Sequence, residues 1–415
     1  MNLSLSSIRS NTSFLNNWFL IASIIAIVGI FFSRAMISIG MIGIVLLYII
    51  TQGWKTTFTK RPADLLWFFL MPVLIMYLIG GLWTDDYSYW LQRIQVKLPL
   101  LFLPLGFWSV KEIITRKTVD SVILLFILLC VATALGSFIY YLLHYKEITD
   151  SYKHAKTIPT IIEHIRYSLL LTIAFFACIH LYFTSPVVKT KTHKNILAGL
   201  AIFLFLFLHI LSIRSGLLAL YATSGMWLLI QVVNSGNKKL LLLIPAAAGF
   251  LVAMYFFVPS LHNKVDYMVR DVNQFVTGKS VNNYSDGNRL LSMKLGIQIG
   301  LEHPWLGVGS GDVQQEMNAV YKKEYPEIIE YNWLIPHNQF VYIFTALGSI
   351  GLLLFTACLI YPILNKNIFS DILCVAILVS AYTSFLSEAT LELQQGIVLV
   401  SLLFSLSYIR IYSKA

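Results

Sequence analysis

Charged residues are scarce in this sequence. Asp, Glu, Lys and Arg make up 12% of the 415 residues, whereas 57% are hydrophobic. Soluble domains carry about a quarter charged residues, so this composition excludes an ordinary soluble globular protein. A helix that crosses a membrane needs about 20 mostly apolar residues, and runs of that kind recur along the whole chain. The sequence therefore predicts an all-α polytopic membrane protein.

Cysteine is also rare, and motifs for metals and nucleotides are missing. The four cysteines, Cys130, Cys178, Cys358 and Cys374, lie inside apolar runs without a CxxC pair, which predicts small buried side chains and no disulfide framework. HExxH, paired-carboxylate and histidine-cysteine patterns are lacking, so we expect no metal and no cofactor. The GVGSGD stretch at 307–312 lacks the spacing of a phosphate-binding loop and predicts a tight turn.

The apolar runs predict about twelve spans. They lie at about 16–33, 35–52, 64–82, 96–113, 119–143, 166–185, 196–213, 216–233, 240–258, 338–363, 370–386 and 396–411. The first run lacks a small-residue cleavage site, which favours an uncleaved span over a signal peptide. Four connections are short and basic, with Lys55, Lys60, Arg61, Lys111, Arg116, Lys117, Lys189, Lys191, Lys194, Lys238 and Lys239. The positive-inside rule places them, and both termini, in the cytoplasm. The net charge of +10 is thus a topology signal and does not indicate a nucleic-acid partner.

One long extramembrane stretch separates the ninth and tenth spans, and it faces outward by the same count. It divides the chain into spans 1–9 (residues 1–258), a helical loop (259–336) and spans 10–12 (337–415). Apolar residues at helical spacing predict an amphipathic helix over 260–276. A second helix is expected from Asp286 to Glu302, followed by a glycine-rich bend, and a third from about Asp312 to Tyr325.

Polar residues that could carry chemistry gather at the outer ends of these spans. Arg214 lies in an almost absent connection between the seventh and eighth spans, where a charge close to hydrocarbon is a functional candidate, although snorkelling to lipid headgroups explains it equally well. His337 directly precedes the tenth span. On a continuous helix it would share a face with Gly348 and Gly351, whose small size would let a neighbouring helix approach closely. Taken alone, His337 is more simply an interfacial histidine bonded to a loop.

Further candidates lie at the same predicted face, on segments far apart in sequence: Arg93, Lys97, His164, Arg166, Arg289 and Glu388. Arginine binds phosphate oxygens as a planar fork. A histidine with a pKa near its usual value of about 6.5 can accept a proton from a hydroxyl nucleophile. Together these residues predict a site for a diphosphate headgroup at the bilayer surface, with a base beside it.

The sequence resembles the O-antigen ligase and O-antigen polymerase superfamily of bacterial inner-membrane glycan transferases. Two short motifs typical of the ligases carry the resemblance: Arg-x3-Leu, as Arg214 and Leu218, and His-Asn-x9-Gly-x2-Gly, as His337, Asn338, Gly348 and Gly351. The stretch from Arg289 to Asp312, with its Pro-x-x-Gly-x-Gly, and the segment SFLSEATLELQQG are also similar to the family. The resemblance implies an architecture like that of GT-C glycosyltransferases.

The resemblance further implies a metal-independent, inverting glycosyltransferase. Such an enzyme moves a glycan from an undecaprenyl diphosphate carrier to an acceptor hydroxyl on the periplasmic face of the inner membrane. The acceptor would be lipid A-core, another glycan or a protein. Carried over to this sequence, His337 would be the base, and Arg214 and Arg289 would bind the diphosphate. Substrate-binding residues would be Arg166, Lys97, His164, Asn338, Glu388 and Arg93, and Leu218, Gly348 and Gly351 would be structural.

Other functions remain open at this point. Within the superfamily, a polymerase or a protein O-oligosaccharyltransferase could use the same cationic face. A transporter or lipid flippase would be expected to place polar residues near the bilayer midplane and often to contain inverted repeats, and neither feature is evident. A membrane scaffold would explain the spans but not the recessed arginines.

Overall fold

The computed structural model describes residues 11–57, 66–152, 157–277 and 285–413, and every regular element in these ranges is a helix. Lys60 and Arg61 of the first basic connection, and residues 282–284 ahead of Asp286, lie outside the described residues. A helix overlaps each of the twelve predicted spans. The all-helical class is confirmed, whereas the number of membrane crossings and the orientation of the termini stay predictions.

Eight helices in the described part of the chain are long and apolar enough to cross a membrane. They are α2 (Thr12–Phe32), α8 (Arg116–Leu143), α10 (His164–Thr184), α11 (Lys191–Leu211), α12 (Arg214–Ser235), α13 (Leu243–Phe257, with the 3-10 turn Lys238–Leu242 before it), α17 (Gln339–Ile363) and α19 (Gln394–Tyr412). The remaining predicted spans correspond to shorter apolar helices: α3 (Arg34–Ile50), α5 (Met71–Gly80), α7 (Pro99–Val110) and α18 (Ile372–Ser387).

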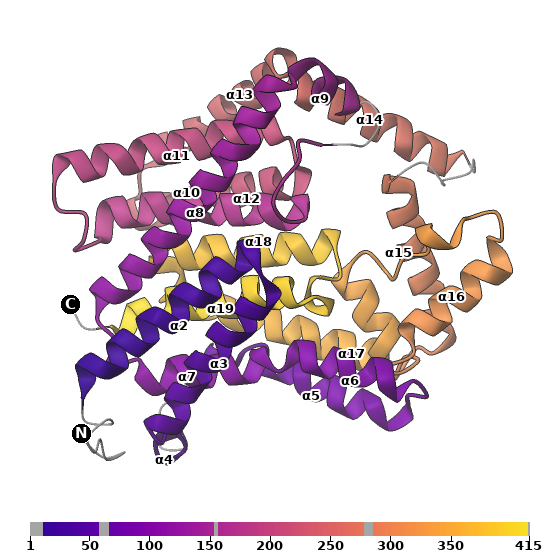
Figure 1. Cartoon of the computed structure of the whole chain (residues 1–415). Helices are drawn as coiled ribbons and strands as arrows, with labels where there is room; N and C mark the ends of the chain where they lie inside the picture. The colour runs from indigo at the N-terminus through magenta and orange to yellow at the C-terminus, as the bar shows by residue number, and fades with distance from the viewer. Residues whose placement is uncertain (1–10, 58–65, 153–156, 278–284, 414–415) are drawn as a thin grey trace.

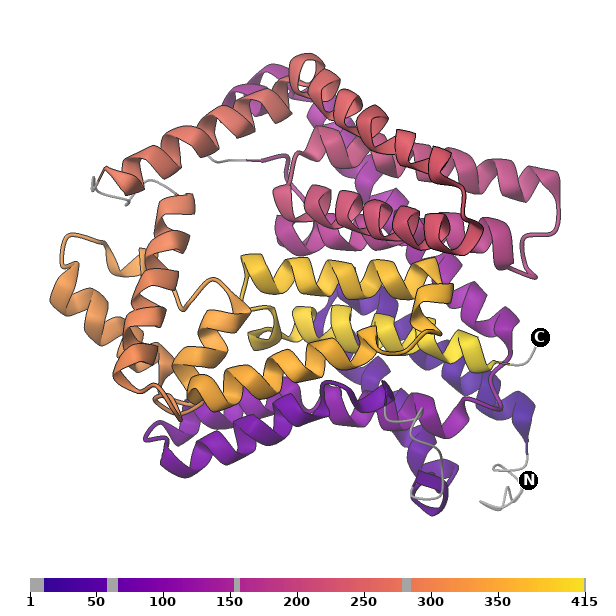
Figure 2. The same ribbon diagram turned by 180° about the vertical axis from the view of Figure 1, so that it is seen from behind.

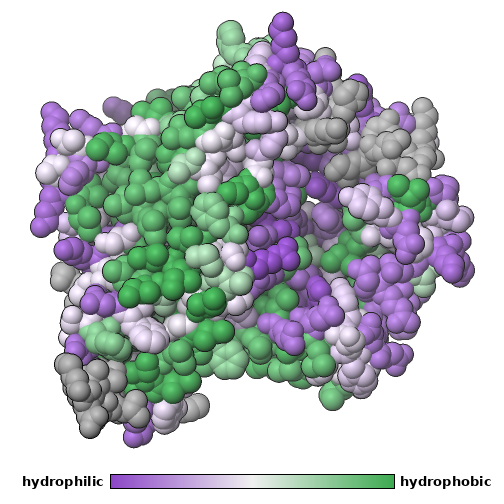
Figure 3. Space-filling view, viewed as in Figure 1, coloured by the Kyte–Doolittle hydropathy of each residue, from purple (hydrophilic) through white to green (hydrophobic). Residues whose placement is uncertain are grey.

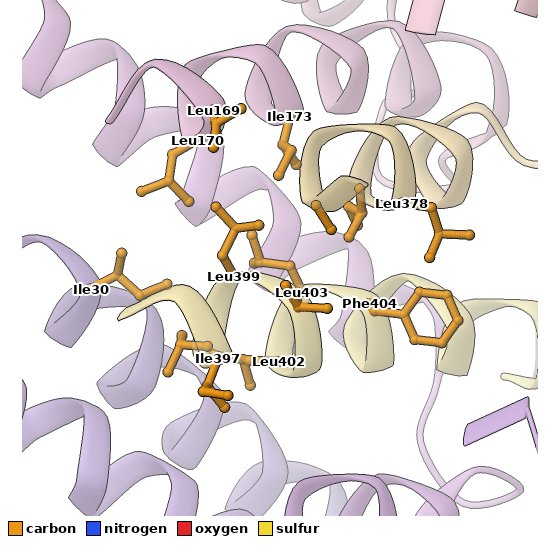
Figure 4. Close-up of a cluster of buried hydrophobic side chains, with 14 of the residues drawn as sticks. Ile30, Leu169, Leu170, Ile173, Leu378, Ile397, Leu399, Leu402, Leu403 and Phe404 are labelled. Atoms are coloured by element: carbon orange, nitrogen blue, oxygen red, sulfur yellow. The ribbon is translucent and has the colours of Figure 1, made fainter. Parts of the chain in front are cut away.

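Helix α19 forms the centre of the bundle. Its apolar residues extend all round the helix, a pattern that fits burial on every side. Leu399 and Leu403 lie in a cluster with Leu170 and Ile173 of α10, and Leu378 of α18 joins it (Figure 4). Helices α10 to α13 form a layer on one side of α18 and α19, and α5, α7 and α17 lie on the other (Figures 1 and 2).

The polar segment stands at one end of this bundle. It contains α14 (Pro259–Val276), α15 (Ser285–Glu302) and α16 (Val313–Glu324), so the three helices expected there are confirmed to within one or two residues at each end. Helix α2 begins and α19 ends at the opposite end (Figures 1 and 2). On the face shown in Figure 3, hydrophobic residues cover much of the bundle, and hydrophilic residues gather around a hollow beside α15 and α16.

Helix α17 is broken at Gly348, which corrects the expectation of a continuous helical face. Gly348 has φ 62° and ψ −165°, values that interrupt the helix. His337 precedes the helix, because Asn338 is its N-cap and has extended backbone angles. The three atoms nearest to a Cβ built at Gly351 all belong to Leu347 of its own helix. The two glycines therefore do not align a packing face beneath His337, as the sequence pattern suggested.

The glycine-rich loop before α16 fills the break. Ser349 N donates to Pro304 O at 2.8 Å, and Val308 N and Gly309 N donate to the carbonyls of Thr345 and Ala346, each at 3.0 Å. Backbone groups freed by the break are thus satisfied by the loop, as burial within a membrane protein requires. The expected tight turn at 307–312 is confirmed, and it also ties the outer loop into α17.

The far end of this loop is held by Asp312. Its carboxylate accepts from Asp85 N at 2.9 Å, Asp86 N at 2.8 Å and Thr84 Oγ1 at 3.0 Å. These groups belong to the turn between α5 and α6 (Tyr87–Lys97). The carboxylate occupies the amides that an anion would otherwise bind, so the geometry favours a structural role for the loop.

We expect Gly348→Ala to destabilise the protein by about 2–5 kcal/mol, because the change adds left-handed strain and a backbone clash. A Cβ at Gly348 would lie 2.3 Å from the backbone carbonyl of Trp305. Thermal unfolding of the purified protein in detergent measures the effect. Gly225→Ala on α12 is the matched control, because a Cβ there meets nothing within 4 Å. Equal melting temperatures for the two variants would contradict the close packing of the loop against the break at Gly348.

Candidate functional site

Four of the ionisable residues predicted from the sequence meet in one cavity of about 510 Å³ at the polar end of the bundle. Arg214 is the first residue of α12, His164 is the first residue of α10, and Arg289 lies in the first turns of α15. His337 lines the cavity from the segment before α17, and Lys264 of α14 joins them. These four residues are spread over 173 positions, from His164 to His337, and they contribute to a single site.

A two-residue connection places Arg214 at the cavity. Ser212 adopts left-handed angles (φ 54°), and its hydroxyl donates to His209 O at 2.6 Å. Ser260, at the start of α14, donates to Ile210 O at 2.7 Å and fastens the turn to the polar segment. The N-cap of α12, Ile213, provides no side-chain hydrogen bond. The positive end of the α12 dipole therefore adds to the charge of Arg214.

Asp286 links the two arginines, and the sequence did not single it out as a site residue. Arg214 donates to its Oδ1, and Arg289 Nη1 lies 3.8 Å from the same oxygen. The spacing of three residues between Asp286 and Arg289 on a helix was a usable signal, since such residues are neighbours on one face. The carboxylate holds both guanidinium groups toward one point of the cavity.

Asp271 of α14 holds the start of α15, the helix that carries Asp286 and Arg289. Its carboxylate accepts from Asp286 N at 2.7 Å and Gly287 N at 2.9 Å, so it caps the first turn of α15. Burial raises the pKa of Asp271. Because both amides donate to it, the start of α15 is fixed and Arg289 is oriented into the cavity. Only the folded segment brings Asp271 to that position.

Lys264 supplies a third cationic group. Burial and the neighbouring Arg214 and Arg289 lower its pKa to about 8. With His337 and His164 neutral, Arg214, Arg289 and Lys264 outnumber the single carboxylate of Asp286 among the residues that line the cavity. The cavity therefore favours an anion that carries more than one negative charge.

His337 presents an imidazole without a hydrogen-bond partner in the described part of the chain. Its backbone N donates to Ser292 Oγ at 3.1 Å, which fixes the segment against α15. Burial, together with the positive charges of Arg289 and Arg166, lowers the pKa of His337 to about 4. The sequence-based expectation of a value near 6.5 is corrected: His337 is neutral at neutral pH and carries a free lone pair.

Asn338 has a local structural function. Its Oδ1 accepts from Phe340 N at 2.9 Å and Val341 N at 3.1 Å, and its Nδ2 donates to Leu386 O at 3.1 Å. These bonds start α17 and tie it to the end of α18. The residue that follows the histidine therefore positions His337, whereas the sequence suggested a substrate contact. Leu218 is half-exposed and lines the cavity.

Arg166 and Glu388 lie between this cavity and an apolar groove. Arg166 Nη2 donates to Glu388 Oε2 at 3.2 Å, and its Nη1 donates to Gln395 Oε1 at 3.1 Å. Burial raises the pKa of Glu388, against the opposing effect of Arg166. The groove, about 860 Å³, runs between α3, α7 and the start of α19, with Arg93 and Arg166 among its polar lining residues.

Lys97 reaches neither cavity, so the predicted substrate contact is replaced by a structural role. The side chain is fully buried, and Nζ donates to Glu392 Oε2 at 2.7 Å. Tyr77 Oη and Gln339 Nε2 also donate to the Glu392 carboxylate, at 2.5 and 3.3 Å. A buried lysine needs an acidic partner, but the sequence did not single out Glu392 as that partner.

Residues 199–356 match the family model described as O-antigen ligase. The match supports assignment to the O-antigen ligase superfamily. The matched range of the O-antigen ligase domain contains Arg214, Arg289, His337 and the broken part of α17. No curated protein matches the chain. Within the described residues, no three His, Cys, Asp or Glu side chains cluster as a metal site requires.

Proposed function

We propose that this member of the O-antigen ligase superfamily transfers a glycan from an undecaprenyl diphosphate carrier to an acceptor hydroxyl. The acceptor would be lipid A-core or a similar molecule, on the periplasmic face of the bacterial inner membrane. One observation carries the proposal: Arg214, Arg289 and His337 line one cavity that joins two cations to a free imidazole. A glycosyl transfer from a diphosphate needs these two components.

The arginines would bind the leaving group. A diphosphate presents several anionic oxygens to a cavity in which guanidinium groups exceed the carboxylate of Asp286. Bidentate arginine contacts are among the strongest charge-assisted hydrogen bonds. As the bond between the anomeric carbon and the diphosphate oxygen breaks, the electron pair stays on that oxygen. Arg214 and Arg289 would then stabilise the added charge where it develops.

His337 would act as the base. Its neutral imidazole would take the proton of the acceptor hydroxyl while that oxygen bonds to the anomeric carbon. A pKa of about 4 in the unliganded protein makes the imidazole a weak base. Bound diphosphate would offset the positive field of Arg289 and so raise the pKa of His337 toward its ordinary value. Donor binding would therefore strengthen the base, and attack opposite the leaving group would invert the anomeric centre.

The apolar groove would hold the polyprenyl chain of the donor. Its lining includes Ile42, Leu46, Ile49 and Phe102, which are exposed outside the bundle core. Arg166 lines this groove, and its partner Glu388 follows the α18 residues that line the charged cavity. A lipid tail in the groove would thus leave its diphosphate at the boundary of the two spaces.

Transfer by the purified full-length protein in liposomes tests this proposal. We expect glycan transfer from an undecaprenyl diphosphate donor to lipid A-core, and equal transfer with and without EDTA, since the charge stabilisation is assigned to arginines. Offering a glycan repeat or a periplasmic protein as the acceptor distinguishes a polymerase and a protein O-oligosaccharyltransferase from a ligase. Loss of transfer with EDTA would contradict the metal-independent mechanism. Donor flux across the bilayer without any transfer would favour a flippase.

A further inference from the structure

A second polar cavity, of about 620 Å³, lies at the end of the bundle opposite the charged cavity. Its polar lining includes Arg116 at the start of α8, His180 in the last turns of α10, Asp371 at the N-cap of α18 and Arg410 near the end of α19. These are the ends of the helices that lie where α2 begins and α19 terminates (Figure 1). None of these residues takes part in the proposed transfer reaction.

Two of the charged residues are already bonded. Arg410 forms a buried ion pair with Asp120 of α8, and its Nη2 also donates to Thr184 Oγ1 at 2.9 Å. The Oδ1 of Asp371 accepts from Leu373 N at 2.8 Å and Cys374 N at 3.2 Å, so it caps α18. The charge of Asp120 balances that of Arg410, and the helix dipole offsets that of Asp371.

Two groups remain without a partner among the described residues. The Nε of Arg116 is buried and makes no hydrogen bond, and Arg116 forms no ion pair in the described chain. His180 is 3% exposed, and its Nε2 is likewise buried without a partner. Its Nδ1 lies 3.3 Å from Asp371 Oδ1, which places the ring proton there and leaves a lone pair on Nε2. Buried polar groups in proteins are nearly always bonded, so the two groups point to a ligand.

An apolar cavity of about 450 Å³ adjoins the polar one. It lies between α10 and α11, and the two cavities share Ile179 and Phe183 of α10. Phe183 is 75% exposed and Ile202 of α11 is 62% exposed, so this cavity opens on the outside of the bundle. A polar chamber beside an apolar groove matches a molecule with an anionic head and a hydrocarbon chain.

We propose that this pair of cavities binds one phospholipid whose headgroup carries a hydrogen-bond donor. The single negative charge of the phosphodiester would lie on the Arg116 guanidinium. A headgroup hydroxyl or ammonium would donate to His180 Nε2. One acyl chain would follow the apolar cavity between α10 and α11. Phosphatidylglycerol and phosphatidylethanolamine both carry such a donor, whereas the quaternary ammonium of phosphatidylcholine has no N–H.

Native mass spectrometry of the delipidated full-length protein tests the proposal, with each of these three lipids added in turn. We expect one bound molecule of phosphatidylglycerol or phosphatidylethanolamine. The lipid that binds with the higher affinity identifies the headgroup that the site prefers. Phosphatidylcholine should bind at least about tenfold more weakly, the cost of leaving a buried acceptor unpaired. Binding of all three lipids with equal affinity would overturn the proposal.

Two matched pairs of variants locate the lipid. Arg116→Ala should weaken binding by about 10- to 100-fold, the range for a hydrogen bond to a charged group. Lys117→Ala should not change binding, because Lys117 is exposed and lies outside the cavity lining. Ala198→Trp should fill the apolar cavity and reduce binding, whereas Ile196→Trp, outside that lining, should not. If Arg116→Ala fails to fold, Ala198→Trp still decides the matter. Unchanged lipid binding in a folded Arg116→Ala or Ala198→Trp variant would contradict the site.

Discussion

Replacing His337 with Ala should reduce glycan transfer by about 10²–10⁴-fold, the contribution of a positioned general base. The imidazole lines the charged cavity and has no hydrogen-bond partner in the described residues, so its removal takes away the proton acceptor and leaves the packing of α17 intact. Asn338, which starts that helix, is unchanged in this variant. Rates of transfer measured under single turnover, with donor at saturation, isolate this step.

His303→Ala is the matched control for this variant. His303 is exposed on the same outer segment and lies outside the cavity lining, so its loss should leave transfer unchanged. His337→Gln keeps a polar side chain without the basicity and should be as inactive as His337→Ala. Full transfer by a folded His337→Ala variant would remove the proposed base.

The pH dependence of the same reaction distinguishes a base from a positioning residue. Because the pKa of His337 is lowered to about 4 in the unliganded protein, its protonation should not reduce kcat/KM between pH 7.5 and about 5. Donor binding would raise that pKa, so the acid limb of the kcat profile should lie at a higher pH than the limb that His337 contributes to kcat/KM.

The lowered pKa of His337 also makes the free energy of unfolding depend on pH. Below about pH 6.5 the histidine takes up a proton in the unfolded chain but not in the folded protein. The folded state should therefore lose stability as the pH falls from about 6.5 toward 4.

Replacing Arg214 or Arg289 with Ala should lower transfer by about 10²–10³-fold, the cost of removing one donor that stabilises developing charge. Both side chains meet at Asp286 and would act on the same diphosphate. The double variant should therefore be much less impaired than the product of the two single effects, because neighbouring groups are not additive. Lysine at either position should restore little activity, since an ammonium group cannot replace the planar fork. Transfer rates and donor affinity are the quantities to measure.

Lys322→Ala is the control for charge alone. Lys322 lies in the last turn of α16, is exposed and is not among the residues that line the cavity, so donor affinity should not change. Asp286→Asn keeps both arginines but removes the carboxylate that competes with phosphate, and donor binding should be retained or strengthened. Wild-type donor affinity and transfer in both arginine variants would show that the diphosphate binds elsewhere.

The apolar composition and the length of the hydrophobic runs determined the helical membrane class, because a backbone that crosses a membrane must satisfy its hydrogen bonds within the segment. The same local logic located the three helices of the outer segment. The residues that meet in the charged cavity, Arg214, Arg289, His337 and His164, were also identified from sequence. Charged and ionisable groups at helix ends stand out against an apolar chain, so their positions carry a signal before any fold is known.

Tertiary structure decided which of those residues share a site and what holds them there. The sequence predicts that Gly348 is a small residue at a helix-packing face. In the structure the loop at 304–309 packs against it, and that loop is 39 residues or more away in sequence. Lys97 has the charge of a ligand-binding residue, but Glu392 arrives from 295 residues away to bury it. Periodicity reports local backbone geometry, whereas the partner of a buried charge and the pKa of a histidine depend on groups brought close only by folding. For that reason the sequence identified Arg214, Arg289 and His337 as candidates, and the fold fixed their geometry, the protonation of His337 and the carboxylates that orient the arginines.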